Sequence, residues 1–296
     1  MMYAITGITG KVGGELARTL LAQGQPVRAV VRDESKGDAW AELGCQVAIA
    51  EMESAAALTR AFTGATAAFI LPPSEFDPEP GYPEAQRVIS NVVSALKSAE
   101  PGRVVCLSTI GADAIKDNLL SQRTMMEDAI TKVGLPLTIL RPGWFIENAL
   151  LDVTSARDAG IIQSFLQPAD RPFPMVATRD VGRVAAELIQ EGWSGKRIVE
   201  LEGPRRISPN DLAMSFGRAL AKVVRVQSVP RDTWETLFRS QGMKNPQPRI
   251  SMLDGFNEGW IEFKERGAEA IKGRIDADAV IAGLLSTDRR DEILKA

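Results

Sequence analysis

Short apolar runs alternate with amphipathic stretches along the first two thirds of the chain. The runs are rich in Val, Ile and Ala, which is typical of buried strands, whereas the stretches between them repeat their apolar positions with helical spacing. Strands that alternate with helices predict a parallel sheet covered by helices on both faces. We therefore expect an α/β fold with a doubly wound parallel Rossmann sheet. After a first strand that begins at Tyr3, strands are expected at 26–31, 46–49, 67–71, 103–109, 137–141 and 198–202, and helices at 36–43, 55–62, 82–99, 119–133 and 179–191.

The pattern becomes mostly helical after about Gly203. Ser208 is suited to cap a helix, with Pro209 at the first helical position and Asp211 in the first turn. We expect two parts, a Rossmann domain over residues 1–202 and a smaller, mostly helical C-terminal lobe over residues 203–296 that packs on it. Within this lobe, helices are also expected at 232–240, 249–264 and 276–286, with a short strand at 226–230.

The composition excludes several kinds of partner and site. The 296 residues are 45% hydrophobic and 25% charged with a net charge of −3, so nothing favours nucleic acid or an anionic membrane surface as partner. The chain has no apolar run of membrane-spanning length and no signal peptide, and Cys45 and Cys106 fit buried thiols, so we expect a cytoplasmic protein. Because histidine is absent, a histidine base, a Ser-His-Asp triad and a histidine-bound metal are excluded, and no metal is expected. No signal for an oligomeric state is visible.

Three glycines follow the first strand with the spacing Gly-x-x-Gly-x-x-Gly, at Gly7, Gly10 and Gly13. The first permits a tight turn, the second allows the backbone to approach a pyrophosphate, and the third lets helix and strand pack closely. The N–H groups and the dipole at the start of the following helix would then hold the phosphates. We therefore predict a dinucleotide site in this loop; the alternative is a purely structural turn. The loop residues expected to bind the cofactor are Gly7, Thr9, Gly10, Lys11, Val12 and Gly13.

A residue at the end of the second strand usually distinguishes NAD from NADP. Here Arg32 occupies that place, and Lys11 adds a second cation near the adenosine ribose. Two cations at one small site favour the 2′-phosphate of NADPH over the free hydroxyl of NADH. The alternative is that Arg32 is a solvated strand-end residue and that Asp33 binds the ribose.

Ligands of open α/β sheets bind outside the carboxyl ends of the strands, at the point where the strand order reverses. Four segments should converge there, namely the glycine loop and the residues that follow the fourth, fifth and sixth strands. The long Pro-rich loop over 72–83 is expected to form a rim of the cofactor or substrate site. Beyond the glycine loop and Arg32, the cofactor-binding candidates are Leu71, Pro72, Ser108, Pro142, Trp144 and Phe145.

These segments resemble the NmrA-like atypical short-chain dehydrogenase/reductases, a family that includes NADPH-dependent quinone oxidoreductases and triphenylmethane-dye reductases. The resemblance covers most of the chain. It implies that Arg32 binds the 2′-phosphate, that residues 142–145 lie beside the nicotinamide and that the lobe after Gly203 helps to close the substrate cleft. The matching segments are 5–13, 27–33, 135–148 and 178–182.

One departure from typical short-chain dehydrogenases is the missing Tyr-x-x-x-Lys pair. Tyr3 lies in the first strand, Tyr82 has Gln86 where the lysine would stand, and the helix before the sixth strand has Met125 and Met126 in place of a lysine. Reduction of a ketone needs a positioned acid, whereas hydride addition to a quinone gives a much less basic oxyanion. A planar quinone-like acceptor is therefore favoured. Candidate substrate contacts are Tyr82, Met125, Trp144 and Asn148.

The sequence leaves two hypotheses open. The first is an NADPH-dependent oxidoreductase that transfers hydride to a quinone or a similar planar acceptor. The second is a non-enzymatic NADP(H)-binding redox sensor, like the regulatory members of the family that the chain resembles. An epimerase or dehydratase of nucleotide sugars is disfavoured because the tyrosine–lysine pair is missing.

Overall fold

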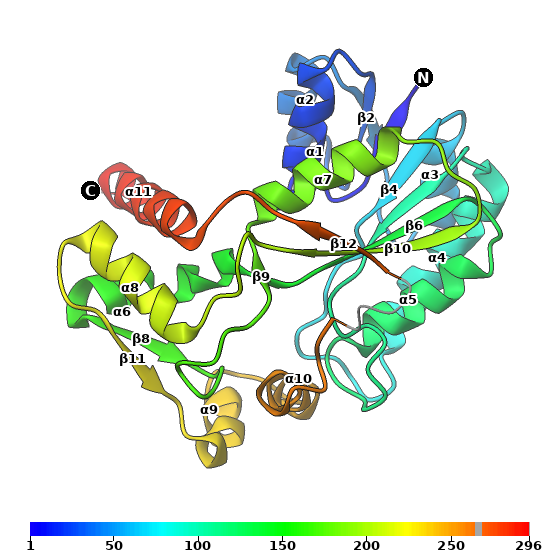
Figure 1. Ribbon diagram of the computed structural model, residues 1–296. Coiled ribbons are helices and arrows are strands. Elements are labelled where there is room, and N and C mark those ends of the chain that lie inside the picture. The colour runs from blue at the N-terminus through cyan, green and yellow to red at the C-terminus, as the bar shows by residue number, and fades with distance from the viewer. Residues whose placement is uncertain (264–267, 296) are drawn as a thin grey trace.

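The computed structural model describes residues 1–263 and 268–295, and within these ranges the main sheet consists of eight parallel strands (Figure 1). Their order is β12-β10-β6-β5-β4-β1-β2-β3. The chain passes outward from β1 through β2 and β3 in one direction, and from β4 through β5, β6 and β10 in the other, so the order reverses between β1 and β4. The predicted doubly wound sheet is confirmed. The strands are β1 (Tyr3–Ile5), β2 (Val27–Val31), β3 (Gln46–Ile49), β4 (Ala67–Ile70), β5 (Val104–Leu107), β6 (Leu137–Pro142), β10 (Lys196–Glu202) and β12 (Glu269–Lys272).

Helices cover both faces of this sheet. Successive residues of a strand point to opposite faces, and in β1 Ala4 packs under one set of helices while Tyr3 and Ile5 pack under the other. Both sets of side chains are buried, which is why the strands have continuous apolar runs. One face carries α3 (Ala55–Phe62), α4 (Pro83–Ala99) and α5 (Ser121–Thr131), and the other carries α1 (Lys11–Ala22), α2 (Asp38–Glu42) and α7 (Thr178–Gln190).

The helices α1 and α7 touch through Gly182. A β-carbon at this position would lie 2.6 Å from Glu15 Cβ and 2.8 Å from the carbonyl oxygen of Val12. These distances are too short for any side chain, so only glycine lets α7 approach α1 this closely. The segment 178–182 noted in the sequence therefore contributes to the packing of the helix that bears the glycine loop.

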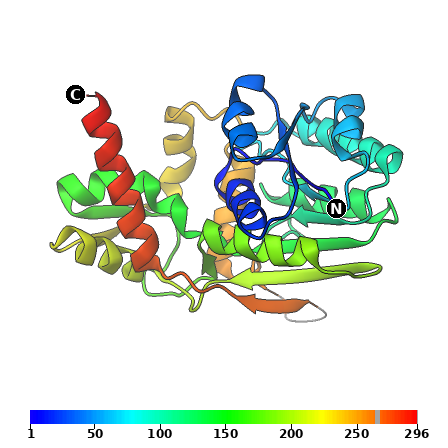
Figure 2. The same ribbon diagram turned by 90° about the horizontal axis from the view of Figure 1, so that it is seen from above.

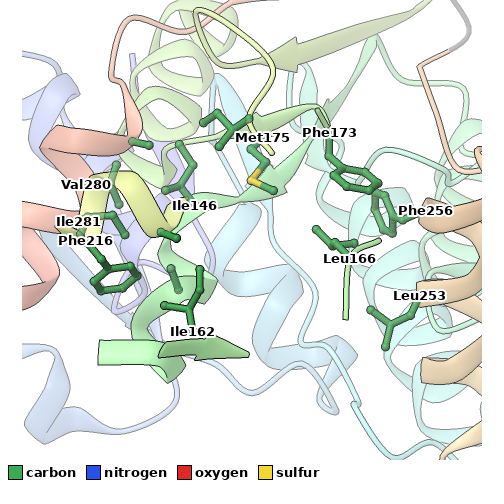
Figure 3. Packing of buried hydrophobic residues seen from close by; sticks show 14 of the residues in the cluster. Ile146, Ile162, Leu166, Phe173, Met175, Phe216, Leu253, Phe256, Val280 and Ile281 are labelled. Atoms are coloured by element: carbon green, nitrogen blue, oxygen red, sulfur yellow. The ribbon is translucent and has the colours of Figure 1, made fainter. Parts of the chain in front are cut away.

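The smaller part of the molecule has its own buried apolar cluster (Figure 3), with a two-stranded parallel sheet of β8 (Ile161–Ser164) and β11 (Arg225–Ser228). Its helices surround Phe216, Trp234 and Phe238, which are all fully buried. A short parallel pair, β7 (Trp144–Phe145) with β9 (Met175–Val176), joins it to the main sheet. The helices are α6 (Val153–Ala159), α8 (Pro209–Leu220), α9 (Trp234–Ser240), α10 (Gln247–Glu258) and α11 (Ala277–Lys295), with 3₁₀ turns η2 (Ile146–Asp152) and η3 (Arg231–Thr233).

The two parts do not correspond to a single cut in the chain. Residues 146–164 belong to the smaller part, since β8 pairs with β11, whereas β12 returns to the edge of the main sheet beside β10. The predicted division into residues 1–202 and 203–296 has a single boundary, whereas the chain passes between the two parts more than once. β12 has no apolar run because its positions are mostly exposed, so the pattern does not indicate a strand there.

Two helices predicted after Gly203 differ in extent from the prediction. The helix expected at 249–264 is α10, which ends at Glu258 with Gly259 in the left-handed conformation, and residue 264 lies outside the described residues. The helix expected at 276–286 continues to Lys295 as α11. Residues 264–267 and 296 of the predicted lobe also lie outside the described residues.

The return of the chain from β12 to α11 is fastened to α7 by Asp180. This carboxylate is 1% exposed and accepts hydrogen bonds from the backbone N–H groups of Arg274 and Ile275, both at 2.8 Å. Arg183 donates to its other oxygen at 3.1 Å. A buried carboxylate is stable here because each oxygen has a donor. As seen from above, α11 then extends away from the sheet (Figure 2).

We predict that Gly182→Ala destabilises the protein by about 1–3 kcal/mol, because the added methyl group overpacks the contact between α1 and α7. Gly283→Ala in α11 is the control, since a β-carbon there meets no atom within 4 Å and alanine favours helix. Urea unfolding monitored by circular dichroism measures both. Equal midpoints for Gly182→Ala and the unchanged protein would contradict the predicted contact.

Candidate functional site

The glycine loop is a tight turn between β1 and α1. Gly7 has φ +64°, and a β-carbon there would lie 2.7 Å from Leu71 Cδ2, while one on Gly13 would lie 2.3 Å from the carbonyl oxygen of Gly7. Only hydrogen fits at these positions, so the glycines allow strand, turn and helix to meet. The N–H of Gly10 donates to the Gly7 carbonyl at 3.0 Å, which closes the turn.

The start of α1 offers unpaired donors beside this turn. Lys11, Val12 and Gly13 are its first three residues, so their N–H groups have no partner within the helix. The N-cap Gly10 has no side chain to satisfy them. Thr9 and Lys11 are exposed, while Val12 is buried against the core. The arrangement is suited to a pyrophosphate.

Thr6 ties this loop to the end of β4. Its hydroxyl donates to the carbonyl oxygen of Phe69 at 3.0 Å and accepts from the N–H of Leu71 at 2.8 Å. Leu71 thus lies directly beside Gly7, as predicted for a segment after the fourth strand. Thr6 was not among the predicted residues; its signal was a polar residue at the end of a buried strand.

Arg32 and Asp33 follow β2 and have different surroundings. Asp33 Oδ1 accepts from the N–H and the hydroxyl of Ser35, at 3.0 and 2.9 Å, and these hydrogen bonds hold the pKa of its carboxyl below the usual range. Asp33 therefore caps the 3₁₀ turn η1 (Glu34–Lys36). The helix predicted at 36–43 is the shorter α2 (Asp38–Glu42), and Lys36 belongs to η1 instead. Arg32 is exposed, and no ion pair of it occurs among the described residues. Its guanidinium is available to a ligand.

The residues after β5 and β6 lie side by side. The N–H of Ser108 donates to Leu140 and that of Ile110 donates to Pro142, both at 2.8 Å. Trp144 and Phe145 are half-buried; Trp144 packs edge-on against Phe256 with 5.3 Å between ring centroids. The structure thus brings Ser108, Pro142 and Trp144 to the same edge of the sheet as the glycine loop, where β1, β4, β5 and β6 are neighbours.

A buried charge network lies at this edge. Arg141 at the end of β6 donates through Nε and NH2 to the two carboxylate oxygens of Glu127 in α5, at 2.9 and 2.6 Å. The Ser108 hydroxyl donates to the same carboxylate, and Asp113 lies 3.4 Å from Arg141 NH1. Ser108, Glu127 and Arg141 are each less than 9% exposed. The sequence hypothesis missed Glu127, because its partners Ser108 and Arg141 lie on other elements and its neighbours in the sequence do not indicate them.

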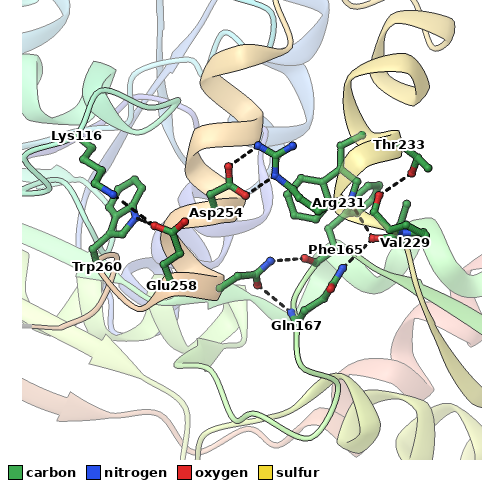
Figure 4. Close-up of polar contacts among 12 residues, drawn as sticks. Lys116, Phe165, Gln167, Val229, Arg231, Thr233, Asp254, Glu258 and Trp260 are labelled. Atoms are coloured by element: carbon green, nitrogen blue, oxygen red, sulfur yellow. Dashed lines mark hydrogen bonds and ion pairs between the residues drawn. The ribbon is translucent and has the colours of Figure 1, made fainter.

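Two loops that follow strands of the main sheet are bound to the smaller part. In the loop after β4, Asp77 accepts from the N–H groups of Lys244 and Asn245 at 2.8 and 2.7 Å, which lowers the pKa of its carboxyl. In the loop after β5, Lys116 lies 3.4 Å from Glu258, which also accepts from the indole of Trp260 (Figure 4). The contacts of Asp77 hold the predicted rim over 72–83 against the segment that precedes α10, and the contact of Lys116 holds the loop after β5 against the end of α10.

The predicted substrate residues have different environments. Tyr82 is 7% exposed, and its hydroxyl donates to Asp117 and to the Asn118 carbonyl at 3.0 and 2.9 Å, which leaves little of its ring for a ligand. Burial raises the pKa of its hydroxyl far above the usual range. Met125 is half-buried against the core beneath α3–α5, whereas Asn148 is exposed. Trp144 is itself part of a predicted cofactor segment and is half-buried.

Neighbouring Glu147 has a structural role. Its carboxylate accepts from the N–H of Thr178 at 2.9 and 3.0 Å and from the threonine hydroxyl at 2.6 Å. It therefore caps the start of α7. This contact brings segments 135–148 and 178–182, which are far apart in the sequence, side by side in the fold.

The described residues form neither a membrane-spanning helix nor a metal cluster. Among the described residues, no helix is both long enough and apolar enough to pass through a membrane. No cluster of three or more potential metal ligands occurs among them either.

The fold and this site define a Rossmann-type nucleotide-binding protein. A family model described as NAD(P)H-binding matches residues 7–192, more than half of the chain. The protein therefore belongs to this NAD(P)H-binding family, and the resemblance to NmrA-like atypical short-chain dehydrogenase/reductases is confirmed at this level.

The chain is similar to several characterised proteins. It is 28% identical over 245 residues to quinone oxidoreductase 2 of Escherichia coli, with 82% of each chain covered. It is 23% identical over 259 residues to an NAD(P)H azoreductase of Xenophilus azovorans, covering 87% of this chain and 85% of the relative. The solved structure of Citrobacter sp. triphenylmethane reductase complexed with NADP(H) has a TM-score of 0.76 at 20% identity, over 96% of this chain and all of that chain.

We predict that Glu127→Gln destabilises the protein by about 3 kcal/mol, because Arg141 loses its main counter-charge inside the fold. Glu235→Gln is the matched control: Glu235 pairs with Arg239 at 2.9 Å on the exposed surface, where such a pair contributes ~0.5 kcal/mol or less. Chemical unfolding of both variants measures the difference. Similar losses in both would show that the buried network is not specially stabilising.

Proposed function

We propose that this protein is an NADPH-dependent oxidoreductase that transfers hydride to a quinone-like or other planar electron acceptor. The observation that carries the proposal is the glycine turn at the start of α1 together with Arg32 after β2, which is exposed and forms no ion pair with the described residues. The names of the relatives, a quinone oxidoreductase, an NAD(P)H azoreductase and a reductase solved with NADP(H), support the same class of reaction.

The cofactor preference follows from the ends of β2 and α1. One oxygen of Asp33, Oδ1, already accepts two hydrogen bonds from Ser35, so the capping role of this carboxylate leaves only Oδ2 for a ribose hydroxyl. The guanidinium of Arg32 and the ammonium of Lys11 are both exposed, and a planar guanidinium forms paired hydrogen bonds with phosphate. Together they favour the 2′-phosphate of NADPH.

The acceptor class follows from the proton chemistry of the site. The helix α5 contains neither tyrosine nor lysine. The Ser108 hydroxyl already donates a hydrogen bond to Glu127, and Glu127 is ion-paired with Arg141. These contacts make both groups poor acids for an alkoxide. Quinones accept hydride without such an acid, and positioning then contributes most of the rate. The residues near the reacting ring would be Leu71, Pro142 and Trp144.

We predict that Arg32→Ala weakens NADPH binding about 10- to 100-fold, the loss expected for a charge-assisted hydrogen bond, and leaves NADH binding nearly unchanged. Fluorescence titration with each nucleotide measures both. Lys97→Ala, a change of an exposed cation in the last turn of α4, is the control and should affect neither. Equal losses for NADPH and NADH would contradict the role of Arg32 at the 2′-phosphate.

We further predict NADPH oxidation with quinones and dyes, and none with simple ketones, because only ketone reduction needs the missing acid. The loss of NADPH absorbance with a panel of both acceptor classes measures this. Tight NADPH binding without turnover of any acceptor would instead favour the non-enzymatic redox sensor. Turnover of ketones alone would contradict the acceptor class.

A further inference from the structure

The loop after β4 is fastened on both sides of the dipeptide Leu71-Pro72. The N–H of Leu71 donates to the hydroxyl of Thr6 at 2.8 Å, and the carbonyl oxygen of Pro72 accepts from NH2 of Arg123 at 3.0 Å. The proline ring fixes its own φ and restricts Leu71 to extended backbone. Leu71 is half-buried beside Gly7, whereas Pro72 is buried. The position of Leu71 is therefore set from one side by the residue after β1 and from the other side by α5.

A cavity of 260 Å³ separates this loop from the first turns of α4 and α5. Its lining includes four successive residues of the loop, from Pro72 to Glu75. A loop that spans a cavity has few packing contacts on that side, so its position there depends on hydrogen bonds. Gln122 and Arg123, two residues of α5 that line the same cavity, provide them.

The two side chains from α5 hold different parts of the loop. Gln122 Nε2 donates to the carbonyl oxygen of Glu75 at 2.9 Å, and Gln122 Oε1 accepts from the N–H of Glu75 at 3.4 Å. Arg123 NH2 binds the hydroxyl of Ser74 at 2.6 Å in addition to the carbonyl of Pro72. Loss of Arg123 alone would thus release the part of the loop next to Leu71, while Glu75 stays bound to α5.

We propose that Arg123 is a positioning residue, which holds Leu71 against the nicotinamide ring for hydride transfer. This inference rests on the proposed function, in which Leu71 lies near the reacting ring. Arg123 acts through the carbonyl of Pro72 and not by contact with the reacting atoms. Its effect on the rate is large because a displacement of about 1 Å at a reacting centre can cost about 100-fold.

Single-turnover oxidation of bound NADPH by a quinone tests this in Arg123→Met and Arg123→Lys. Methionine keeps an apolar stem without a donor, whereas lysine can still donate to the carbonyl of Pro72. We expect the rate constant to fall about 10- to 100-fold in Arg123→Met and to recover at least in part in Arg123→Lys. The Kd of NADPH should change less than about three-fold, because the phosphates bind at the glycine turn and at Arg32.

This measurement separates positioning from stabilisation of the fold. The rate constant of a single turnover does not depend on how many molecules are folded, so a merely structural role would lower the unfolding midpoint and leave the rate constant unchanged. An unchanged rate constant in Arg123→Met, or equal losses in Arg123→Met and Arg123→Lys, would overturn the proposal. If Arg123→Met does not fold, Arg123→Gln decides in its place, because its amide ends two atoms short of the guanidinium NH2 group.

Arg87→Gln is the matched control. Arg87 lines the same cavity, but it lies on the exposed surface of α4 and pairs with Glu84 at 3.6 Å. The single-turnover rate constant of this variant should equal that of the unchanged protein. A loss as large as that of Arg123→Met would show that any change of charge at the cavity slows the reaction, and would overturn the specific role of Arg123.

The fluorescence lifetime of bound NADPH tests the placement of the ring without any turnover. A nicotinamide held in place has a longer lifetime than a mobile one, so the lifetime should shorten in Arg123→Met at full occupancy. If the unchanged protein reduces no acceptor, the oxidoreductase proposal fails, and the lifetime still tests Arg123. Equal lifetimes in both proteins would overturn the positioning role and leave the oxidoreductase proposal standing, because turnover is measured with the unchanged protein.

Discussion

The close approach of backbone to backbone around α1 is the constraint on which the site depends. Gly13 lies against the carbonyl of Gly7, and Gly182 of α7 lies against the carbonyl of Val12. The helix is thereby held between the first turn and a second helix, and its unpaired N–H groups are fixed in direction. Because a β-carbon on Gly13 or Gly182 would push these elements apart, the position of the predicted phosphate site depends on the missing side chains of these two residues.

A second constraint is the buried pair of Glu127 and Arg141, with Ser108 bound to it. It links α5 to the ends of β5 and β6. Burying charges is tolerated here because each has a partner. The same pairing occupies the groups that could have supplied a proton.

The loops that form the site also join the two parts of the molecule. Asp77 binds backbone N–H groups of Lys244 and Asn245, and Lys116 pairs with Glu258. Arg231 and Asp254 connect η3 with α10 through two hydrogen bonds of 2.6 Å (Figure 4). The smaller part is thus built against the carboxyl edge of the sheet, and the loop after β4 contacts both the glycine turn and this part.

The sequence by itself determined the features that depend on neighbouring residues: the alternation of strands and helices, the glycine turn, the caps at Ser208, and the cation after β2. Tertiary structure decided the rest. The pairing of β12 with β10, the inclusion of residues 146–164 in the smaller part, the burial of Tyr82 and the partners of Glu127 and Arg123 all join residues far apart in the chain. Local propensity acts over one turn or one strand, whereas these contacts depend on which surfaces remain to be covered once the sheet has formed.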